Sequence, residues 1–369
     1  IKGLQLKKYI YICKPKSTIM ENIFAKRLKS ARIMKGLSMD ALCDVMGHIV
    51  SKQSLSKYEN AKMLPDSTVL IALSKALEVS VDYLFRPYKI EMPSIEFRKK
   101  SKLKVSEVES IKEKVRDRIE RYFEIENMLD INSDFKVDFS NITVQRAEDV
   151  KSLAHRLRRE WNLGEDAIGN MISTLEDNEV KIIELNVSTE FDGLSGYVNE
   201  SFPIIVLNNN FTAERKRFTA LHELGHLLLN FDPSLSQNDK EKYCNIFANE
   251  MLIPGNQFIR QLGAARKDIS LQELIPIQKQ FGISIDALMY KAKELNVISE
   301  QRYRTYCIKK NGNPALKDMA NQCRYSKEYS DRFERLIYRA VASEVISYSK
   351  AAVLLGTPVH ELKANLTFV

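Results

Sequence analysis

Two histidines lie four residues apart in a segment whose apolar residues repeat at helical spacing. They are His222 and His226, and Thr212 precedes the segment as a good helix N-cap. Residues four apart share one face of a helix, so both imidazoles can reach one zinc ion at about 2.0–2.1 Å. The pattern therefore predicts a helix that is buried on one side and carries a metal site on the other. Its apolar face comprises Phe218, Leu221, Leu224 and Leu228.

Glu223 directly follows the first histidine and is turned about 100° from it around the helix. A carboxylate there can take a proton from a zinc-activated water, because zinc lowers the pKa of that water towards about 7. Chance does not explain the pattern. With five histidines and 48 acidic residues in 369, only about 0.009 occurrences of His-acid-x-x-His are expected. We therefore interpret Glu223 as a general base and the two histidines as metal ligands. The alternative is a pair of ordinary core or surface histidines.

A third protein ligand is needed if one position on the metal is to stay open for water. Glu241 begins the segment EKYCNIFANEMLIPG, in which Glu241 and Asn245 share a helical face. We prefer Glu241 as the ligand, with Asp239 and Glu250 as alternatives. Asn245 would accept a hydrogen bond from the outer N–H of a ligand histidine. We interpret Cys244 as a small buried apolar residue and not as a ligand.

Two β-branched segments precede the histidine helix, and both have the pattern of strands. They are VKIIEL (180–185) and PIIVLN (203–208), with FDGLSGYVN (191–199) between them. The two glycines of the middle segment indicate turns and also permit close backbone approach. We expect an extended protein substrate to lie along GLSGYVN as a strand edge. Tyr197 is a candidate donor to the oxyanion, and a packed tyrosine beside a strand is the alternative.

The segment RFTALHELGHLLLN, followed by EKYCNIFANEMLIP, resembles the ImmA/IrrE-type zinc metallopeptidases. The resemblance extends upstream through FDGLSG and PIIVLN and downstream to residues 281–299, and it departs where Cys244 replaces a commoner alanine. It implies that His222, His226 and Glu241 bind Zn²⁺ and that Glu223 is the general base of a zincin-like endopeptidase. Relatives with this domain order cleave repressors, which implies that the protein substrate is a repressor or the chain itself.

Residues 20–88 contain several short helical segments separated by caps and breaks, with Ser38, Ser51 and Ser80 as N-caps. Two short helices across a tight turn, then a capped polar helix, are typical of a helix-turn-helix that binds DNA. We expect Leu42, Val45 and Met46 to point inward. The alternative is a small helical bundle whose polar face only contacts water. The residues expected to contact base edges or phosphates are Lys52, Gln53, Ser54 and Lys57.

The same segment resembles the Cro/CI-repressor-type (XRE) helix-turn-helix family. The resemblance rests on RLKSARIMKGLSMDAL and on VSKQSLSKYENAKMLPDSTVLIALSKALEVSVDYLF, and it departs at residues 48–50, where the turn is longer than usual. It implies binding of double-stranded DNA at an operator, usually as a homodimer on a palindrome. The net charge of residues 20–88 is only +3, from 10 basic and 7 acidic residues, so affinity needs two modules or a second basic region.

The remaining segments are interpreted as helical. Ser106 with Glu109 is a capping box that opens a long amphipathic helix in the connector. The basic run FRKKSKLK (97–104) is a candidate for further phosphate contacts. Further helices are expected after Ser270 and Ser284. Residues 348–362, YSKAAVLLGTPVHEL, resemble a second helix-turn-helix, and a small helical cap is the alternative.

Composition fits a multidomain globular chain with 44% hydrophobic and 28% charged residues. It contains no apolar run of about 18 residues, so we expect no membrane association. Five scattered cysteines without a CxxC pair indicate a reducing, cytoplasmic location. Of the net charge of +8, residues 1–19 contribute +5. We interpret them as a basic extension that is disordered or lies upstream of a natural start at Met20. The alternative is a basic arm that contacts phosphates.

The expected fold is mainly α with a small α+β part. It comprises a basic extension (1–19), an all-α helix-turn-helix bundle (20–88), a helical connector (89–145), a metallopeptidase domain with a short sheet (146–300) and a helical C-terminal region (301–369). The sequence thus predicts a DNA-binding transcriptional regulator that carries a zinc-dependent endopeptidase. The alternative is a transcription factor whose metal-binding domain senses or stabilises without proteolysis. Glu223 favours the enzyme, because a structural metal site has no use for a base beside an open position.

Overall fold

The computed structural model describes residues 16–87 and 103–367, and its contacts divide them into two compact units. We call residues 16–87, 103–130 and 337–367 the helical unit and residues 131–336 the α+β unit. The chain therefore leaves the helical unit after residue 130 and returns to it at residue 337. The connector and the C-terminal region, which we expected as separate parts, both contribute to the same unit as the helix-turn-helix bundle.

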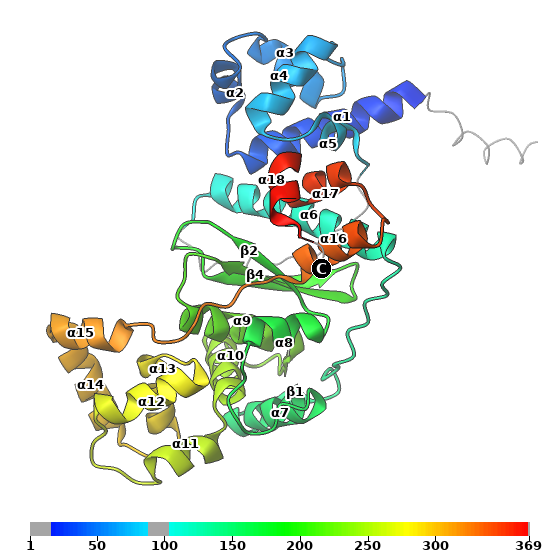
Figure 1. Ribbon diagram of the computed structural model, residues 1–369. Coiled ribbons are helices and arrows are strands. Elements are labelled where there is room, and N and C mark those ends of the chain that lie inside the picture. The colour runs from blue at the N-terminus through cyan, green and yellow to red at the C-terminus, as the bar shows by residue number, and fades with distance from the viewer. Residues whose placement is uncertain (1–15, 88–102, 368–369) are drawn as a thin grey trace, which may run out of the picture. The chain divides into compact units, whose positions relative to one another are not determined.

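Five helices form the helix-turn-helix bundle of the helical unit (Figure 1). Ser38, Ser51 and Ser80 cap helices of this bundle, as predicted, and Asp66 caps a further one. Each cap side chain accepts a hydrogen bond from a first-turn N–H that would otherwise lack a partner. The core between the helices is mainly aliphatic and includes Leu28, Leu42, Leu55 and Leu73. The helices are α1 (Lys16–Met34), α2 (Met39–Val45), α3 (Lys52–Glu59), α4 (Ser67–Leu77) and α5 (Val81–Phe85).

The bundle differs from the expectation at two points. Helix α1 begins at Lys16, four residues before the expected start of the bundle at residue 20; residues 1–15 lie outside the described residues. Val45 is 57% exposed, whereas Leu42 and Met46 are buried. Helix α2 is only seven residues long, and its inward face is filled by Leu42 and Met46, which are four residues apart.

The long helix α6 (Val105–Met128) begins slightly earlier than predicted. Lys104 is the N-cap, and the Glu107 carboxylate accepts a hydrogen bond from its backbone N–H at 2.9 Å. The predicted box of Ser106 and Glu109 is therefore wrong, because Ser106 already lies within the first helical turn. The predicted apolar stripe of α6 is buried at Ile111, Val115, Ile119 and Tyr122. Most of the basic run at 97–104 lies outside the described residues.

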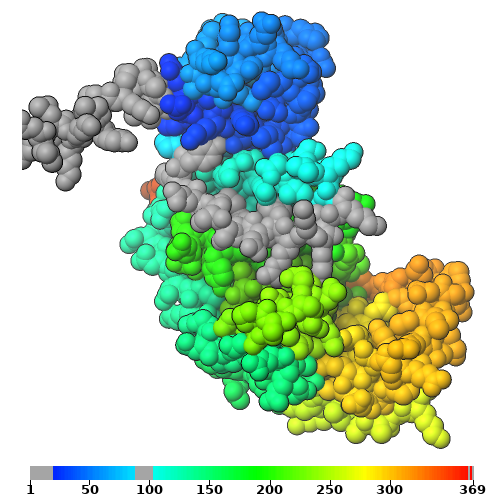
Figure 2. Space-filling model, turned by 180° about the vertical axis from the view of Figure 1, so that it is seen from behind, coloured from blue at the N-terminus to red at the C-terminus, as the bar shows by residue number. Residues whose placement is uncertain are grey.

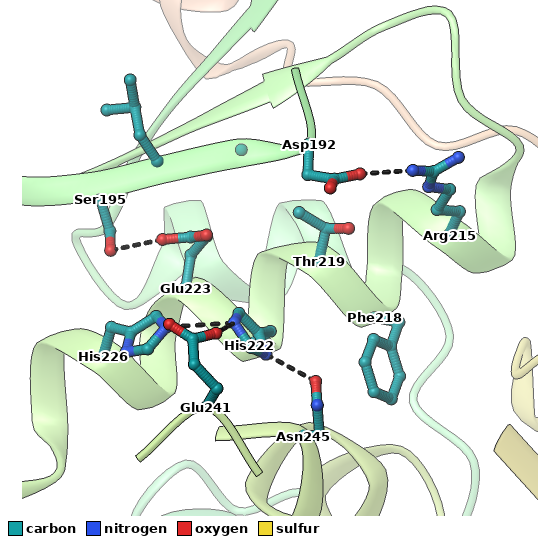
Figure 3. Close-up of a pocket in the computed structure, with 12 residues that line it drawn as sticks. Asp192, Ser195, Arg215, Phe218, Thr219, His222, Glu223, His226, Glu241 and Asn245 are labelled. Carbon is teal, nitrogen blue, oxygen red and sulfur yellow. Dashed lines mark hydrogen bonds and ion pairs between the residues drawn. The ribbon is translucent and has the colours of Figure 1, made fainter. Parts of the chain in front are cut away.

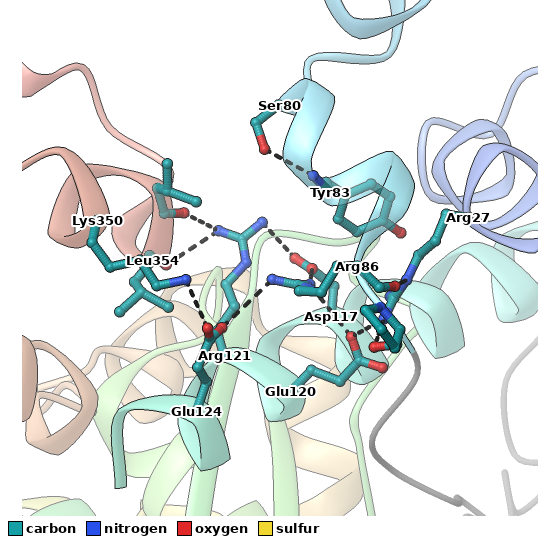
Figure 4. A network of polar contacts seen from close by, with 12 residues as sticks. Arg27, Ser80, Tyr83, Arg86, Asp117, Glu120, Arg121, Glu124, Lys350 and Leu354 are labelled. Atoms are coloured by element: carbon teal, nitrogen blue, oxygen red, sulfur yellow. Dashed lines mark hydrogen bonds and ion pairs between the residues drawn. The ribbon is translucent and has the colours of Figure 1, made fainter. Parts of the chain in front are cut away.

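Ion pairs join α6 to the helix-turn-helix bundle and to the C-terminal helices (Figure 4). Arg27 of α1 pairs with Glu120 at 2.7 Å, and Arg86 pairs with Asp117 at 2.8 Å. On the C-terminal side, Lys350 pairs with Glu124 at 2.7 Å. Helix α6 therefore contacts both the helix-turn-helix bundle and the C-terminal helices. The C-terminal helices are α16 (Arg332–Ala342), α17 (Tyr348–Leu355) and α18 (Val359–Asn365), with Gly356 at a φ of +73° in the turn between the last two.

The α+β unit contains a three-stranded sheet in the order β2-β4-β3. β2 (Lys181–Leu185) is parallel to β4 (Phe202–Asn208), and β3 (Gly193–Val198) is antiparallel to β4 at the edge. Both predicted strands are present. The two glycines expected in turns lie within β3 itself, so that part of the prediction is wrong. A second, two-stranded sheet pairs β1 (Thr143–Val144) with β5 (Asn230–Phe231).

Helices α9 (Ala213–Leu228) and α10 (Gln237–Leu252) pack against each other beneath the three-stranded sheet (Figure 1). Thr212 caps α9, as predicted. Leu221 and Leu224 are fully buried in the core of this unit. Helices α7 (Ala147–Glu160) and α8 (Met171–Asp177) also contribute to this core.

A second group of helices follows α10, and Figure 2 shows their surface in yellow and orange. The helices expected after Ser270 and Ser284 are present; Ser270 forms a capping box with Glu273, and Ser284 caps the next helix. After this group, residues 322–331 return along α9, where buried Glu328 pairs with buried Arg217. Within the described residues, no helix has the length and apolar character needed to cross a membrane. The helices are α11 (Gly255–Leu262), α12 (Leu271–Phe281), α13 (Ile285–Glu294), α14 (Glu300–Gly312) and α15 (Pro314–Asn321).

Candidate metal centre and its pocket

Helices α9 and α10 bring His222, His226 and Glu241 together (Figure 3). The two histidine Nε2 atoms are 3.0 Å apart. The Glu241 carboxylate lies 3.3 Å from Nε2 of His222 and 3.6 Å from Nε2 of His226. Tetrahedral zinc with ligands at about 2.0–2.1 Å requires ligand atoms about 3.3–3.4 Å apart. The three side chains therefore fit a small divalent ion such as zinc and leave a fourth position open.

The two alternative acidic ligands lie elsewhere. Asp239 is in the first turn of α10, where it accepts a hydrogen bond from the capping hydroxyl of Ser236 at 2.6 Å. Glu250 is buried and pairs with Lys291 at 2.6 Å. Burial alone would raise the pKa of Glu250, but hydrogen bonds from His155 and Lys291 hold it at about 2. Glu250 is therefore a structural anion, and Glu241 is the acidic residue that meets the histidines.

Two consecutive residues of α10 contact the outer nitrogens of the histidines. Asn245 Oδ1 lies 2.8 Å from Nδ1 of His222, and Cys244 Sγ lies 3.0 Å from Nδ1 of His226. A proton on each Nδ1 would leave the Nε2 lone pair available for a metal. Cys244 is fully buried, as the sequence predicts. Sequence reasoning missed its contact with His226, although Cys244 lies three residues after Glu241 and thus on the same helical face.

The edge strand β3 runs along α9 in a regular register. Ser195 donates a hydrogen bond to Glu223 at 2.7 Å, and the Tyr197 hydroxyl donates to the Leu227 carbonyl at 3.1 Å. Two residues advance about 6.7 Å along a strand, and four residues advance about 6.0 Å along a helix. Every second residue of β3 therefore lies opposite every fourth residue of α9. At Gly193 a Cβ atom would lie 2.8 Å from Cγ2 of Thr219. This close approach of strand and helix therefore requires glycine.

Tyr197 is half-buried, and burial raises the pKa of its hydroxyl. Its hydroxyl is bonded to the backbone of α9, and Tyr197 is absent from the residues that line the pocket beside the histidines. The structure therefore favours the packed tyrosine over the oxyanion donor.

A pocket of about 280 Å³ lies between β3 and α9, above the three candidate ligands. Glu223 lines it together with Ser195, and half-buried Phe218 supplies an apolar wall. At one end Asp192 pairs with Arg215 (Figure 3). Sequence reasoning missed Ser195 and Arg215. The sequence could have indicated Arg215, because it precedes His222 by seven residues and so lies on the same face of the helix. No sequence pattern indicates Ser195, because its contact depends on how β3 packs.

The predicted DNA-contacting residues lie on α3 of the helical unit. Lys52, Gln53 and Lys57 are exposed, whereas Ser54 is half-buried. The Ser54 hydroxyl lies 3.1 Å from that of the capping Ser51. Lys52 pairs with Asp40 at 2.7 Å, and both of these side chains are more than half exposed. Three side chains are thus presented to solvent, and the hydroxyl of the fourth is engaged in the helix cap.

Comparison with known families connects these two sites to two domains. Residues 28–84 match the family model described as Helix-turn-helix, and residues 175–293 match Peptidase_M78, described as the IrrE N-terminal-like domain. The chain joins a helix-turn-helix domain to an IrrE-like domain. Helix α3 lies in the helix-turn-helix domain, and all three candidate metal ligands lie in the IrrE-like domain. Both resemblances inferred from the sequence are confirmed.

A curated relative is the SPbeta prophage-derived uncharacterized HTH-type transcriptional regulator YonR of Bacillus subtilis (strain 168). The two sequences are 39% identical over 64 residues, which is 17% of this chain and 57% of the relative. This chain therefore spans little more than half the length of the relative that it matches.

Proposed function

We propose that this chain is a transcriptional regulator that binds operator DNA and hydrolyses a peptide bond in a protein substrate. The helix-turn-helix domain would bind the DNA, and the IrrE-like domain would be a zinc-dependent endopeptidase whose substrate is a repressor or the chain itself. The observation that carries the peptidase proposal is Glu223, a carboxylate that lines the pocket and is held by Ser195 at 2.7 Å beside the three candidate ligands.

In this proposal His222, His226 and Glu241 hold the zinc ion. When bound, zinc would polarise water or a carbonyl oxygen and lower the pKa of the water. Ser195 donates to one carboxylate oxygen of Glu223, and within the described residues no hydrogen bond occupies the other. The second oxygen is therefore available for proton transfer. Through it Glu223 would take a proton from the attacking water and deliver it to the leaving amine nitrogen.

Among the residues that the structure describes, no strand pairs with the outer edge of β3. This edge would bind the substrate. The Asn209 N–H, just beyond β4, donates to Leu185 of β2 at 2.9 Å. Odd-numbered residues of β4 therefore direct their backbone groups towards β2, and even-numbered residues direct theirs towards β3. The residues of β3 opposite odd-numbered β4 residues include Gly193 and Ser195, and their backbone groups point outward. An extended peptide can pair with these groups directly above the candidate metal site.

For the helix-turn-helix domain, we propose that α3 enters the major groove of double-stranded DNA. Gln53 would hydrogen-bond to a base edge, and Lys52 and Lys57 would contact bases or phosphates. The domain's modest charge favours binding as a homodimer at a palindromic operator, because two modules double the number of phosphate contacts.

The test is metal analysis of the purified full chain together with a cleavage assay against repressors encoded near its gene. We expect about one zinc ion per chain and metal-dependent cleavage of one repressor. The matched Glu223→Gln variant should keep the metal and lose cleavage, because the amide preserves the shape of the side chain but cannot accept the proton. Bound metal with no cleavage of any candidate would instead support a metal-sensing regulator.

A further inference from the structure

Arg215 has a distinctive position in the pocket of the IrrE-like domain. Among the described residues that line this pocket, it is the only lysine or arginine. It lies in the first turn of α9, and its partner Asp192 directly precedes β3. The pair therefore sits where the pocket meets the start of the strand edge to which a peptide would bind.

The guanidinium of Arg215 is oriented but remains accessible. It lies 3.6 Å from the centroid of the Phe211 ring, so stacking restricts its orientation. Its side chain is 51% exposed and that of Asp192 is 59% exposed. An ion pair this open to water stabilises little, because solvent competes for both charges. A substrate carboxylate can therefore compete with Asp192 for the Arg215 guanidinium.

Two distances, one along β3 and one along α9, place Arg215 about three or four peptide residues from Glu223. Along the strand, Asp192 is three residues before Ser195, which is a distance of about 10 Å. Along the helix, Arg215 is eight residues before Glu223, which is a distance of about 12 Å. An extended peptide advances about 3.3 Å per residue, so both distances correspond to three or four residues.

We propose that Arg215 is a specificity subsite for a carboxylate of the substrate, three or four residues from the scissile bond. The inference rests on the proposed peptidase function and adds the substrate class. A peptide that pairs antiparallel with β3 would run from Val198 towards Asp192, which puts the carboxylate on the C-terminal side of the scissile bond. A parallel peptide would put it on the N-terminal side. It belongs either to an aspartate or glutamate side chain or to the C-terminus of a short substrate.

The experiment uses an array of random-sequence peptides in two forms, one amidated at the C-terminus and one with a free terminus. Binding is measured to the full-length Glu223→Gln chain in the presence of zinc, so that no turnover is needed. We expect carboxylate-bearing peptides to be enriched about fivefold at the subsite position, a ratio reasonable for one partly exposed ion pair. Enrichment in both forms identifies a side chain, and enrichment only with free termini identifies the chain end.

Three variants, each made in the Glu223→Gln chain, test whether Arg215 causes the preference. Arg215→Lys should keep it, Arg215→Ala should lose it, and Arg215→Glu should select basic side chains instead. Arg260→Glu is the matched control, because Arg260 is 66% exposed, pairs with Glu165 at 3.4 Å and does not line the pocket. It should leave the carboxylate preference unchanged.

The outcomes separate this inference from the proposed function. No carboxylate preference, or one that persists in Arg215→Glu, would overturn the subsite. The same array is also treated with the wild-type chain and zinc. Carboxylate-dependent binding without any cleavage would support the subsite and overturn the peptidase proposal.

Discussion

Ser195 on β3 donates a 2.7 Å hydrogen bond to Glu223 on α9. The bond links the strand to which a substrate would bind with the side chain that would move the proton. It fixes the carboxylate in a single orientation, and efficient proton transfer depends on such positioning. The Gly193 contact with Thr219, one strand repeat earlier, sets the same close spacing between strand and helix.

We expect Ser195→Ala to lower the peptidase kcat about tenfold, because Glu223 loses its orienting bond but keeps its chemistry. Zinc content should not change, since Ser195 is not one of the three candidate ligands. Ser195→Thr retains a hydroxyl and serves as the control. Steady-state cleavage of the identified repressor by the three proteins is the measurement. An unchanged kcat in Ser195→Ala would show that the bond does not contribute to catalysis.

Removal of a candidate ligand should abolish metal binding without affecting DNA binding. His226→Ala or Glu241→Ala should each lose zinc and cleavage together, because two remaining ligands hold zinc weakly. DNA binding measured on the same samples should persist, since the helix-turn-helix domain has its own core. One zinc ion per chain in either variant would refute the ligand assignment.

Asn245 should tune the affinity of the metal site. Asn245→Ala removes the partner of His222 Nδ1, and loss of such outer hydrogen bonds typically lowers metal affinity about 10–100-fold. Competition with a chelator of known affinity gives the zinc Kd directly. Asn245→Asp keeps an acceptor oxygen and should bind zinc at least as well as the wild type. Equal zinc affinity of Asn245→Ala and wild type would argue against this role.

On the DNA side, Gln53→Ala should cost about 1–3 kcal/mol at one operator position, because a bidentate partner for a base is lost. Lys57→Ala should weaken binding to all sequences alike and reduce the salt dependence. A salt-titrated binding series on a selected operator and on random DNA distinguishes the two effects. If the wild-type chain binds both DNAs equally at every salt concentration, α3 does not recognise a specific DNA sequence.

The stability of the α+β unit should decrease as the pH rises towards neutrality. Burial raises the pKa of Glu176 to about 7, despite hydrogen bonds from Ser330 and from the backbone of Asp331 and Arg332. The folded state therefore holds a proton more tightly than the unfolded chain, in which the pKa is near 4.5. The contribution of Glu176 to the unfolding free energy is fully present below about pH 4.5. It is lost as the pH rises through about 7, and the loss is about 3 kcal/mol at most.

Glu176→Gln stays neutral and should flatten this pH dependence. Trp161 is the only tryptophan of the chain and lies in the α+β unit, so its fluorescence during urea unfolding reports on this unit. The comparison is the unfolding free energy of wild type and variant at pH 5 and pH 8. Glu160→Gln, at a side chain that is 36% exposed, controls for removal of a charge. The prediction would be contradicted if the unfolding free energy rose from pH 5 to pH 8 and rose more in the wild type than in Glu176→Gln.

Local signals in the sequence determined most of the helices and half of the site. Serine caps at Ser38 and Ser51 act on the first turn of their own helices, and the spacing of His222 and His226 acts within one helix. Such contacts span three or four residues, so they can be read without a fold. One error is a local competition at the start of α6, where Glu107 and not Glu109 accepts a hydrogen bond from the N-cap backbone.

Only the tertiary structure decided which side chains meet across elements. Glu241, Asp239 and Glu250 were all eligible ligands by sequence, and the packing of α10 against α9 brings Glu241 alone to the histidines. The contacts of Ser195 with Glu223 and of Cys244 with His226 likewise depend on strand–helix and helix–helix approach. Sequence periodicity gives the face of an element on which a residue lies, but the partner of that face is set by long-range packing.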